Sequence, residues 1–170
     1  MGECGVVVRE ATDADLPEVI RINMESLPEH YTLSFWRNIL YTWGKAFLVA
    51  DLCGEIVGYI MCRTLWRRSF FRRFLMGRVG HIISIAVREG FRGRGIGTRL
   101  LVEAMRRLHD HYGAKEVYLE VRVSNERAIR LYRRLGFRVV QRVVRYYADG
   151  EDAYIMARPL PLEAEGGDGL

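Results

Sequence analysis

The stretch of residues 92–97 combines two arginines with three glycines, directly after an apolar run at residues 82–87. A helical pattern begins at Ile96, with apolar residues at spacings of three to five. The first turn of a helix leaves unpaired N–H groups, and its dipole favours negative charge there. Glycines permit close approach, while Arg92 and Arg94 add guanidinium groups suited to phosphate oxygens. The stretch therefore predicts a pyrophosphate site, although a glycine-rich loop with merely solvated arginines would have the same composition.

Two other phosphate-binding loops do not fit this stretch. A Walker loop requires Gly-Lys followed by Ser or Thr, and residues 92–97 contain no lysine. A dinucleotide-binding fingerprint requires the spacing G-x-G-x-x-G, whereas the glycines here occupy positions 93, 95 and 97. The pattern that remains is Arg-x-x-Gly-x-Gly after a buried strand.

Hydrophobic periodicity places this loop in a series of strands and helices that predicts a mixed α/β sheet with helices on both faces. We expect one domain over residues 1–160 and a disordered, acidic, glycine-rich tail over residues 161–170. Asn125 is a candidate cap for the last helix. The expected strands are residues 6–9, 46–51, 55–65, 82–87, 116–123, 139–144 and 153–158, and the expected helices are residues 12–26, 33–43, 96–108 and 125–135.

The loop at residues 92–97 resembles the acyl-coenzyme A loop of the GNAT acetyltransferases, which reads Gln/Arg-x-x-Gly-x-Gly/Ala. Residues 27–31, Leu-Pro-Glu-His-Tyr, are similar to a Leu-Pro-Glu-Asn-Tyr loop of N-terminal acetyltransferases. His30 is the one departure, and it leaves the flanking Glu29 and Tyr31 in place.

Three later segments extend the resemblance. Residues 118–125 and 131–137 are similar to the second half of the family. Residues 146–154, Tyr-Tyr-Ala-Asp-Gly-Glu-Asp-Ala-Tyr, resemble the NatA catalytic subunit and its archaeal RimI/NatA-like relatives. The resemblance covers about residues 5–160 and implies a GNAT fold, with a mixed, mostly antiparallel sheet of about seven strands.

The resemblance implies acetyl-CoA as the acetyl donor. Amides of the glycine loop would hold its pyrophosphate, a free strand edge would pair with the pantetheine arm, and Tyr132 would donate to the departing sulfur. From the sequence alone, Tyr132 could equally be a core tyrosine and Asn125 only a helix cap. The residues expected to bind the cofactor are Ile85, Ala86, Val87, Arg92, Gly93, Arg94, Gly95, Ile96, Gly97, Thr98, Asn125 and Tyr132.

The acceptor would be an amine, which must lose a proton before it attacks. An α-amino group with a pKa near 8 costs about 1 kcal/mol to deprotonate at pH 7, and a lysine about 5 kcal/mol, so an α-amine needs only a modest base acting through water. Glu29, His81 and Glu120 are the candidates. Glu120 interrupts an apolar strand, which is costly without a task or partner, although a salt bridge to an arginine would also explain it. His81 and Glu120 could together bind a metal ion, but two protein ligands make a sparse site, and we expect no bound metal.

The same resemblance assigns Glu29, Tyr31 and Tyr147 to the peptide groove, where ordinary packing is the alternative for both tyrosines. Such a groove favours small first residues, namely Ser, Ala or Thr, with a broader range that includes Met. The expected partners are protein N-termini, with ribosome association as a further expectation. An enzyme restricted to one ribosomal protein, as in RimI, is a second interpretation.

Residues 66–78 hold five arginines interleaved with four aromatic residues. This segment could contact RNA, or it could be a loop or short helix that packs its aromatics inward and solvates its arginines. The sequence leaves both interpretations open, with an RNA- or ribosome-binding module as a third functional class. We expect no obligate nucleic-acid partner.

Composition sets the remaining bounds. The chain has 170 residues, a formal net charge of +5, and no apolar run or leader pattern that predicts a membrane span or signal peptide, so a cytoplasmic protein is expected. Cysteines at 4, 53 and 62 are odd in number and lack metal-ligand spacing, which predicts reduced thiols.

Overall fold

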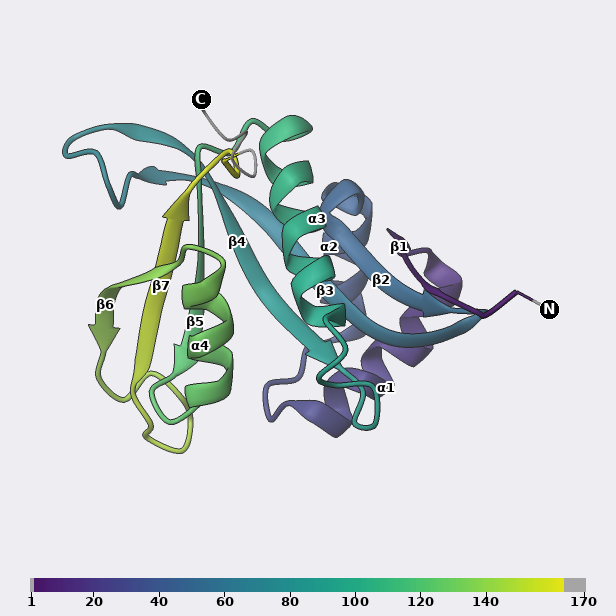
Figure 1. The fold of residues 1–170 in the computed structure, drawn as a ribbon. Coiled ribbons are helices and arrows are strands. Elements are labelled where there is room, and N and C mark those ends of the chain that lie inside the picture. Colours follow the sequence, from purple (N-terminus) through teal and green to yellow (C-terminus); the bar gives the residue numbers. More distant parts are fainter. Residues whose placement is uncertain (1, 164–170) are drawn as a thin grey trace, which may run out of the picture.

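Seven strands form one sheet in the order β1-β2-β3-β4-β5-β7-β6 in the computed structural model, which describes residues 2–163 (Figure 1). Every neighbouring pair is antiparallel except β4 and β5. The expected mixed, mostly antiparallel sheet is thus confirmed, while residues 164–170 of the expected tail lie outside the described part. The strands are β1 Val6–Glu10, β2 Phe47–Leu52, β3 Glu55–Arg68, β4 Met76–Val87, β5 Glu116–Arg122, β6 Arg138–Val143 and β7 Ala153–Pro159.

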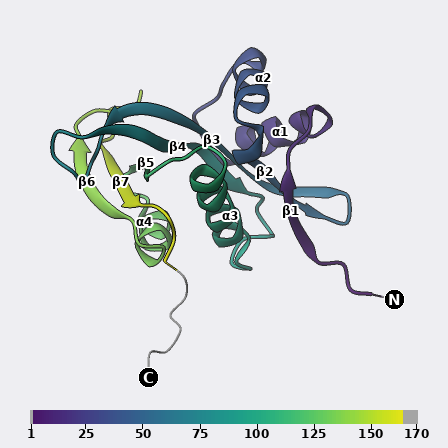
Figure 2. The ribbon, with the colours of Figure 1, turned by 90° about the horizontal axis from the view of Figure 1, so that it is seen from above.

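The longer helices cover both faces of the sheet, as the periodicity predicts (Figure 2). Helices α1 (Leu16–Ser26) and α2 (Leu33–Thr42) pack on one face, and α3 (Ile96–Asp110) and α4 (Glu126–Arg134) on the other. Short 3₁₀ turns at Asp13–Asp15 and Gly44–Ala46 complete the elements. No helix in the described part of the chain combines the length and apolarity that a membrane crossing requires.

Strands β4 and β5 touch only briefly before they diverge. Their parallel pairing comprises Val79 with Glu116, Gly80 with Val117, and His81 with Tyr118, although both strands continue well beyond these pairs. Figure 1 shows the two strands separating from this point. The divergence opens the sheet beside α4 and, among the described residues, leaves one edge of β4 without a strand neighbour.

The segment at residues 66–78 is the outer part of a strand hairpin: residues 66–68 and 76–78 extend β3 and β4, and residues 69–75 between them form a loop with no helix. The loop alternative of the sequence-based expectation is therefore confirmed for the central residues, whereas the flanking strands are a correction. Pairing of β3 with β4 continues outward to Arg68 and Met76, so both strands are longer than predicted and the hairpin projects from the body (Figure 1). Phe70 and Phe71 pack inward, whereas Trp66 and Phe74 are exposed. Inward packing of the aromatics therefore holds for only part of the segment.

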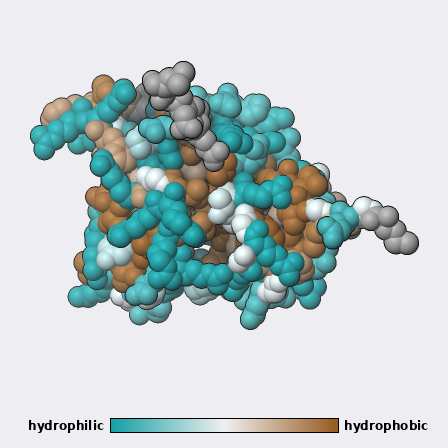
Figure 3. All heavy atoms as spheres, viewed as in Figure 1, coloured by the Kyte–Doolittle hydropathy of each residue, from teal (hydrophilic) through white to brown (hydrophobic). Residues whose placement is uncertain are grey.

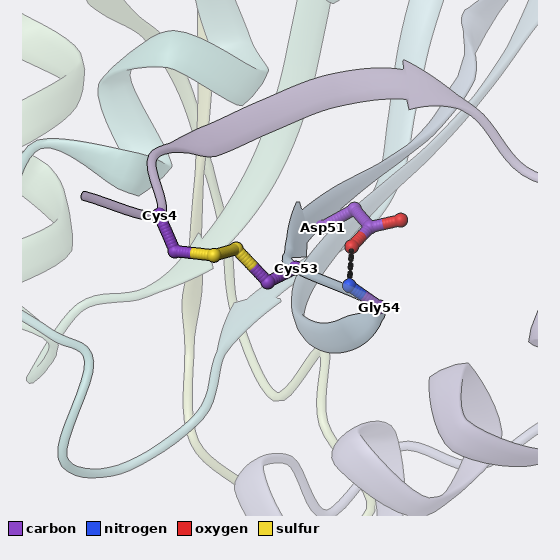
Figure 4. The surroundings of a disulfide bond; sticks show 4 residues. All are labelled: Cys4, Asp51, Cys53 and Gly54. Atoms are coloured by element: carbon purple, nitrogen blue, oxygen red, sulfur yellow. Dashed lines mark hydrogen bonds between the residues drawn. A yellow bond between two sulfur atoms is a disulfide. The ribbon is translucent and has the colours of Figure 1, made fainter. Parts of the chain in front are cut away.

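A second correction concerns the cysteines. Cys4 and Cys53 form a disulfide, with their Cα atoms 5.9 Å apart (Figure 4). The pairing of Val6 with Leu52 brings the flanking segments together, which cysteine spacing along the chain could not reveal. Cys53 and Gly54, both at positive φ, form the tight β2–β3 turn, and Gly54 N–H donates to Asp51. The thiol of Cys62 is free and buried.

Candidate functional site

A cavity of about 740 Å³ lies where β4 diverges from β5, between the end of β4, the start of α3 and α4. Figure 3 shows the surface hollowed between the α3 and α4 regions. The structure brings the expected cofactor residues together there, with the exception of Arg94. Those that line the cavity are Ile85, Ala86, Val87, Arg92, Gly93, Gly95, Ile96, Gly97, Thr98, Asn125 and Tyr132.

The loop before α3 presents bare backbone to this cavity. Gly93 and Gly95 have φ angles of +78° and +79°, which L side chains rarely adopt, and a Cβ at either position would meet nothing within 4 Å. Gly95 is the residue from which α3 starts. The open space and the unpaired amides of the first turn together suit an anion.

The two arginines of the loop differ in position. Arg92 lines the cavity and its Nε–H donates to the carbonyl of Val87 at 2.9 Å, which ties the loop to the end of β4. Arg94 lies outside the cavity lining, with its guanidinium carbon 5.3 Å from the centre of the Phe91 ring. Of these two, Arg92 is therefore the one placed to meet a ligand inside the cavity.

The opposite wall comes from α4. The Asn125 side chain accepts a hydrogen bond from Ala128 N–H at 3.2 Å, which confirms the predicted cap, and its amide nitrogen makes no hydrogen bond within residues 2–163. Tyr132 is buried, and burial raises the pKa of its phenol to about 12. Its hydroxyl has no hydrogen-bond partner in the described part of the chain, so a protonated donor faces the cavity.

Two of the other candidate catalytic residues, His81 and Glu120, meet at the base of the divergence, whereas the Glu29 carboxylate pairs with Arg122 instead. His81 Nε2 lies 2.8 Å from Glu120 Oε2, and Arg63 Nε–H donates to His81 Nδ1 at 3.2 Å. Because Nδ1 accepts, neutral His81 carries its proton on Nε2 and donates it to Glu120. The His81 ring also stacks on Tyr118, at 4.4 Å between ring centres.

His81 and Glu120 differ in their capacity to bind a further group. Both nitrogens of His81 are occupied, whereas Glu120 keeps a second carboxylate oxygen that makes no hydrogen bond within residues 2–163. Among the described residues, the salt-bridge partner of Glu120 is His81 and no arginine. No group of three or more potential metal-ligating side chains occurs in the part of the chain that the structure describes.

The loop at residues 27–31 begins at the cavity and brings Tyr31 near Glu120. Leu27 lines the cavity, and the Tyr31 hydroxyl donates to the carbonyl of Ile83 at 3.4 Å. Burial, with the charges of Glu29 and Glu120 nearby, raises the pKa of Tyr31 to about 12. Tyr31 therefore stays a neutral donor beside two carboxylates at physiological pH.

His30, the departure from the family pattern, holds this loop in place. Its Nδ1 lies 3.1 Å from the side-chain oxygen of the buried Asn23. The Asn23 amide in turn donates to the carbonyl of Glu29 and to the hydroxyl of Tyr59, both at 3.1 Å. The network fixes the backbone of the loop against α1 and β3.

Arg122 is a site residue that sequence reasoning missed. Its guanidinium contacts Glu29 at 2.9 Å, Asp149 at 2.8 Å and Glu151 at 3.0 Å, and lies 4.0 Å from the centre of the Tyr147 ring. It therefore joins the loop at residues 27–31 to the loop between β6 and β7. The sequence feature that could have identified Arg122 is a charged residue in a mostly apolar strand, two positions after Glu120. Arg63 has the same feature in its own strand.

Comparisons with known proteins agree with this geometry. Residues 16–137 match the acetyltransferase (GNAT) family. An N-alpha-acetyltransferase of Sulfolobus acidocaldarius is 51% identical over 154 residues, which cover 90% of this chain and 92% of that protein. The N-terminal acetyltransferase A complex catalytic subunit ard1 of Schizosaccharomyces pombe is 36% identical over 88% of this chain and 82% of that protein.

The fold itself is also shared with a solved structure. Ard1 from Thermoplasma volcanium superposes with a TM-score of 0.79 at 31% identity, covering 92% of this chain and 98% of that one. The chain belongs to the acetyltransferase (GNAT) family, and within it to the N-alpha-acetyltransferases, the acyltransferases that acetylate protein N-termini.

Proposed function

We propose that this enzyme moves the acetyl group of acetyl-CoA directly to the α-amine of peptides and nascent proteins whose first residue is Ser, Ala or Thr, with a range that extends to Met. The observation that carries the proposal is the continuity of the site. Leu27 of the loop at residues 27–31 lines the anion-suited cavity, and Tyr31 of the same loop is near enough to Glu120 for that carboxylate to help raise the pKa of its phenol, so a donor in the cavity and an amine beside Glu120 would meet.

The donor side fits acetyl-CoA, which supplies an activated thioester when bound. Amides at the start of α3 and the Arg92 guanidinium would hold its pyrophosphate, because Gly93 and Gly95 leave that backbone open. Outward-facing backbone groups of β4 would pair with its amide-bearing arm along the unpaired edge. Asn125 would donate its free amide, and the neutral Tyr132 hydroxyl would donate to the departing sulfur.

On the acceptor side, Glu120 would take the proton of the incoming ammonium group. It would do so directly or through one water, and the carboxylate oxygen not bonded to His81 is the accepting atom. His81 would orient Glu120, since its Nε2–H is committed to that carboxylate. Because an α-amine needs only about 1 kcal/mol for deprotonation at pH 7, this single carboxylate suffices.

The first residue of the substrate would lie against Glu29, Tyr31 and Tyr147. Tyr31 is held by Ile83 and stacks on Phe35, and Tyr147 packs against Tyr146 and Arg122. Because these side chains are fixed in this way, the peptide groove between them has little freedom to widen. This supports a preference for small first residues. Free α-amines on such residues arise on newly synthesised proteins. We therefore propose that the enzyme acts in the cytoplasm, in association with the ribosome.

A matched pair of peptides tests the proposal. One begins with free Ser and carries an acetylated lysine, and the other has an acetylated Ser and a free lysine. We expect release of free CoA with the first peptide only. Equal turnover of the second would refute the α-amine acceptor. A series that varies the first residue then separates a broad enzyme from one restricted to a single ribosomal protein.

A further inference from the structure

The projecting hairpin at residues 66–78, here named the basic arm, has a charge that the acetyl-transfer site does not use. It holds five arginines, at 67, 68, 72, 73 and 78, and no acidic residue. None of them forms an ion pair with a carboxylate within residues 2–163. Their combined charge equals the formal net charge of the whole chain, +5, so the rest of the chain is neutral in sum.

Strand register sorts the arm into two faces. Trp66 pairs with Arg78 and Arg68 with Met76, so these four side chains share one face, and all are exposed, Trp66 by 69%. The opposite face packs inward through Leu65 and Val79 against Tyr118. The outward face is therefore an open strand surface that alternates arginine with apolar side chains.

The arm is fixed to the body at its inner face, so its outward residues have a defined position. The buried carboxylate of Glu116 accepts hydrogen bonds from the Ser69 hydroxyl and from Phe70 N–H. The Arg67 guanidinium lies over Phe70, 3.8 Å from the ring centre. Arg67 thus has a packing role, which leaves four outward arginines for a partner.

The tip of the basic arm, like its outward strand face, combines exposed arginines with an exposed aromatic ring. Phe74 is 83% exposed and follows Arg72 and Arg73, which are also exposed. We propose that the basic arm binds single-stranded nucleic acid, with its outward arginines on phosphates and with Trp66 and Phe74 stacking on bases. Guanidinium groups interleaved with open aromatic rings match this ligand, because each nucleotide offers one anion and one flat face.

Two other partners fit less well. An acidic peptide would satisfy the arginines but would leave the rings of Trp66 and Phe74 without a flat apolar partner. A lipid surface would suit the exposed Phe74, Leu75 and Met76 at the tip. It would leave the ring of Trp66 unused, because Trp66 lies on the strand, separated from Phe74 by the Arg68–Met76 pair.

The test uses the full-length protein and a fluorescein-labelled single strand of about 12 nucleotides, as RNA and as DNA of one sequence. We expect anisotropy to report binding to at least one of the two strands, with an affinity that falls as salt rises. Replacing Arg68, Arg72 and Arg73 by Gln should weaken binding about tenfold or more and reduce the log–log salt slope by about 2. Replacing Arg37, Arg106 and Arg130 by Gln removes the same charge elsewhere and should change neither.

The aromatic residues provide an independent measurement. Trp66→Ala and Phe74→Ala should each weaken binding about fivefold or more with an unchanged salt slope, and bound strands should quench Trp66 fluorescence. All variants should keep wild-type turnover of a short peptide, so this result does not depend on the acetyl-transfer proposal.

Four outcomes would overturn the inference. They are no binding of either strand at low salt, equal weakening by the control triple variant, unchanged affinity in both aromatic variants, and Trp66-dependent binding of phosphatidylglycerol vesicles without binding of nucleic acid.

Discussion

Glu120 illustrates how much one side chain can depend on its neighbours. It lies on a strand that is otherwise mostly buried, yet one carboxylate oxygen is bonded to His81 and the other makes no hydrogen bond within residues 2–163. His81 is fixed in turn by Arg63. In the mechanism that we propose, Arg63 and His81 orient the carboxylate and Glu120 accepts the proton. One variant tests each of these two roles.

Glu120→Gln should lower kcat about 100-fold or more while leaving acetyl-CoA affinity unchanged, because the amide cannot accept the proton but preserves the shape. Steady-state kinetics and calorimetric titration measure the two quantities. Glu126→Gln, an exposed change at the start of α4, is the control and should alter neither. Wild-type turnover in Glu120→Gln would remove Glu120 from the mechanism.

Arg63→Met should release His81 Nδ1 and so allow the tautomer with the proton on that nitrogen. Nitrogen-15 shifts of the His81 ring report the tautomer directly, and the wild-type ring should carry its proton on Nε2. We expect kcat to fall about tenfold, with partial recovery in Arg63→Lys, because a turned ring no longer orients Glu120. A wild-type ring protonated on Nδ1 would contradict donation from His81 Nε2 to the Glu120 carboxylate.

At the scale of elements, the site depends on where helices begin and where loops are tied. Helix α3 starts at a glycine with positive φ, α4 starts at the Asn125 cap, and both starts border one cavity. Arg122 connects two loops from opposite ends of the chain. The glycine at the start of α3 and the Arg122 contacts can each be removed by a separate substitution.

Gly95→Trp should abolish measurable acetyl-CoA binding, because the side chain would enter open space at the start of α3. The change also forces a non-glycine residue into φ +79°, so a matched control is needed. Gly113→Trp supplies it: the φ angle is +67°, a Cβ also meets nothing within 4 Å, and the position lies beyond the other end of α3. If both variants bind acetyl-CoA normally, the loop is not the cofactor site.

Arg122→Gln should raise the KM for peptide about tenfold at unchanged acetyl-CoA affinity, since Glu29 and the β6–β7 loop lose their shared partner. Arg122→Lys should recover little, because one ammonium cannot meet three carboxylates with planar geometry. Arg142→Gln breaks an ion pair to Asp152 on the same hairpin without touching Glu29, and should leave KM unchanged. An equal rise in KM in this control would mean general loosening of the hairpin.

For the whole molecule, the order of elements could be predicted because periodicity and turn signals are local. The glycine loop and Glu120 were also visible locally, as a motif and as a charge in an apolar strand. Arg122 and Arg63 had the same local signal as Glu120, but their roles could not be predicted, because their partners come from distant strands and loops that only the sheet register brings together. The projecting hairpin was missed because cross-strand pairing, rather than apolar alternation, extends β3 and β4.

The disulfide belongs to this scale as well, because it closes a loop with a sequence separation of 49 residues. Cys4→Ser should lower the free energy of unfolding by about 2–4 kcal/mol, measured by denaturant titration under non-reducing conditions. Cys53→Ser should lose the same amount, and the double variant no more than either single one. Three thiols reactive in the denatured, unreduced protein would show that the bond is absent.

The brief contact between β4 and β5 has a consequence for how long the protein lasts in a cell. Three residue pairs form the strand-to-strand seam between the two halves of the sheet, and the cavity opens where that seam ends. An acetyl-CoA molecule held there would contact both halves of the sheet and stabilise their arrangement. A ligand that binds only the native state raises the stability of the protein in proportion to the logarithm of the ligand concentration. The survival of the folded enzyme would then follow the acetyl supply that its reaction consumes.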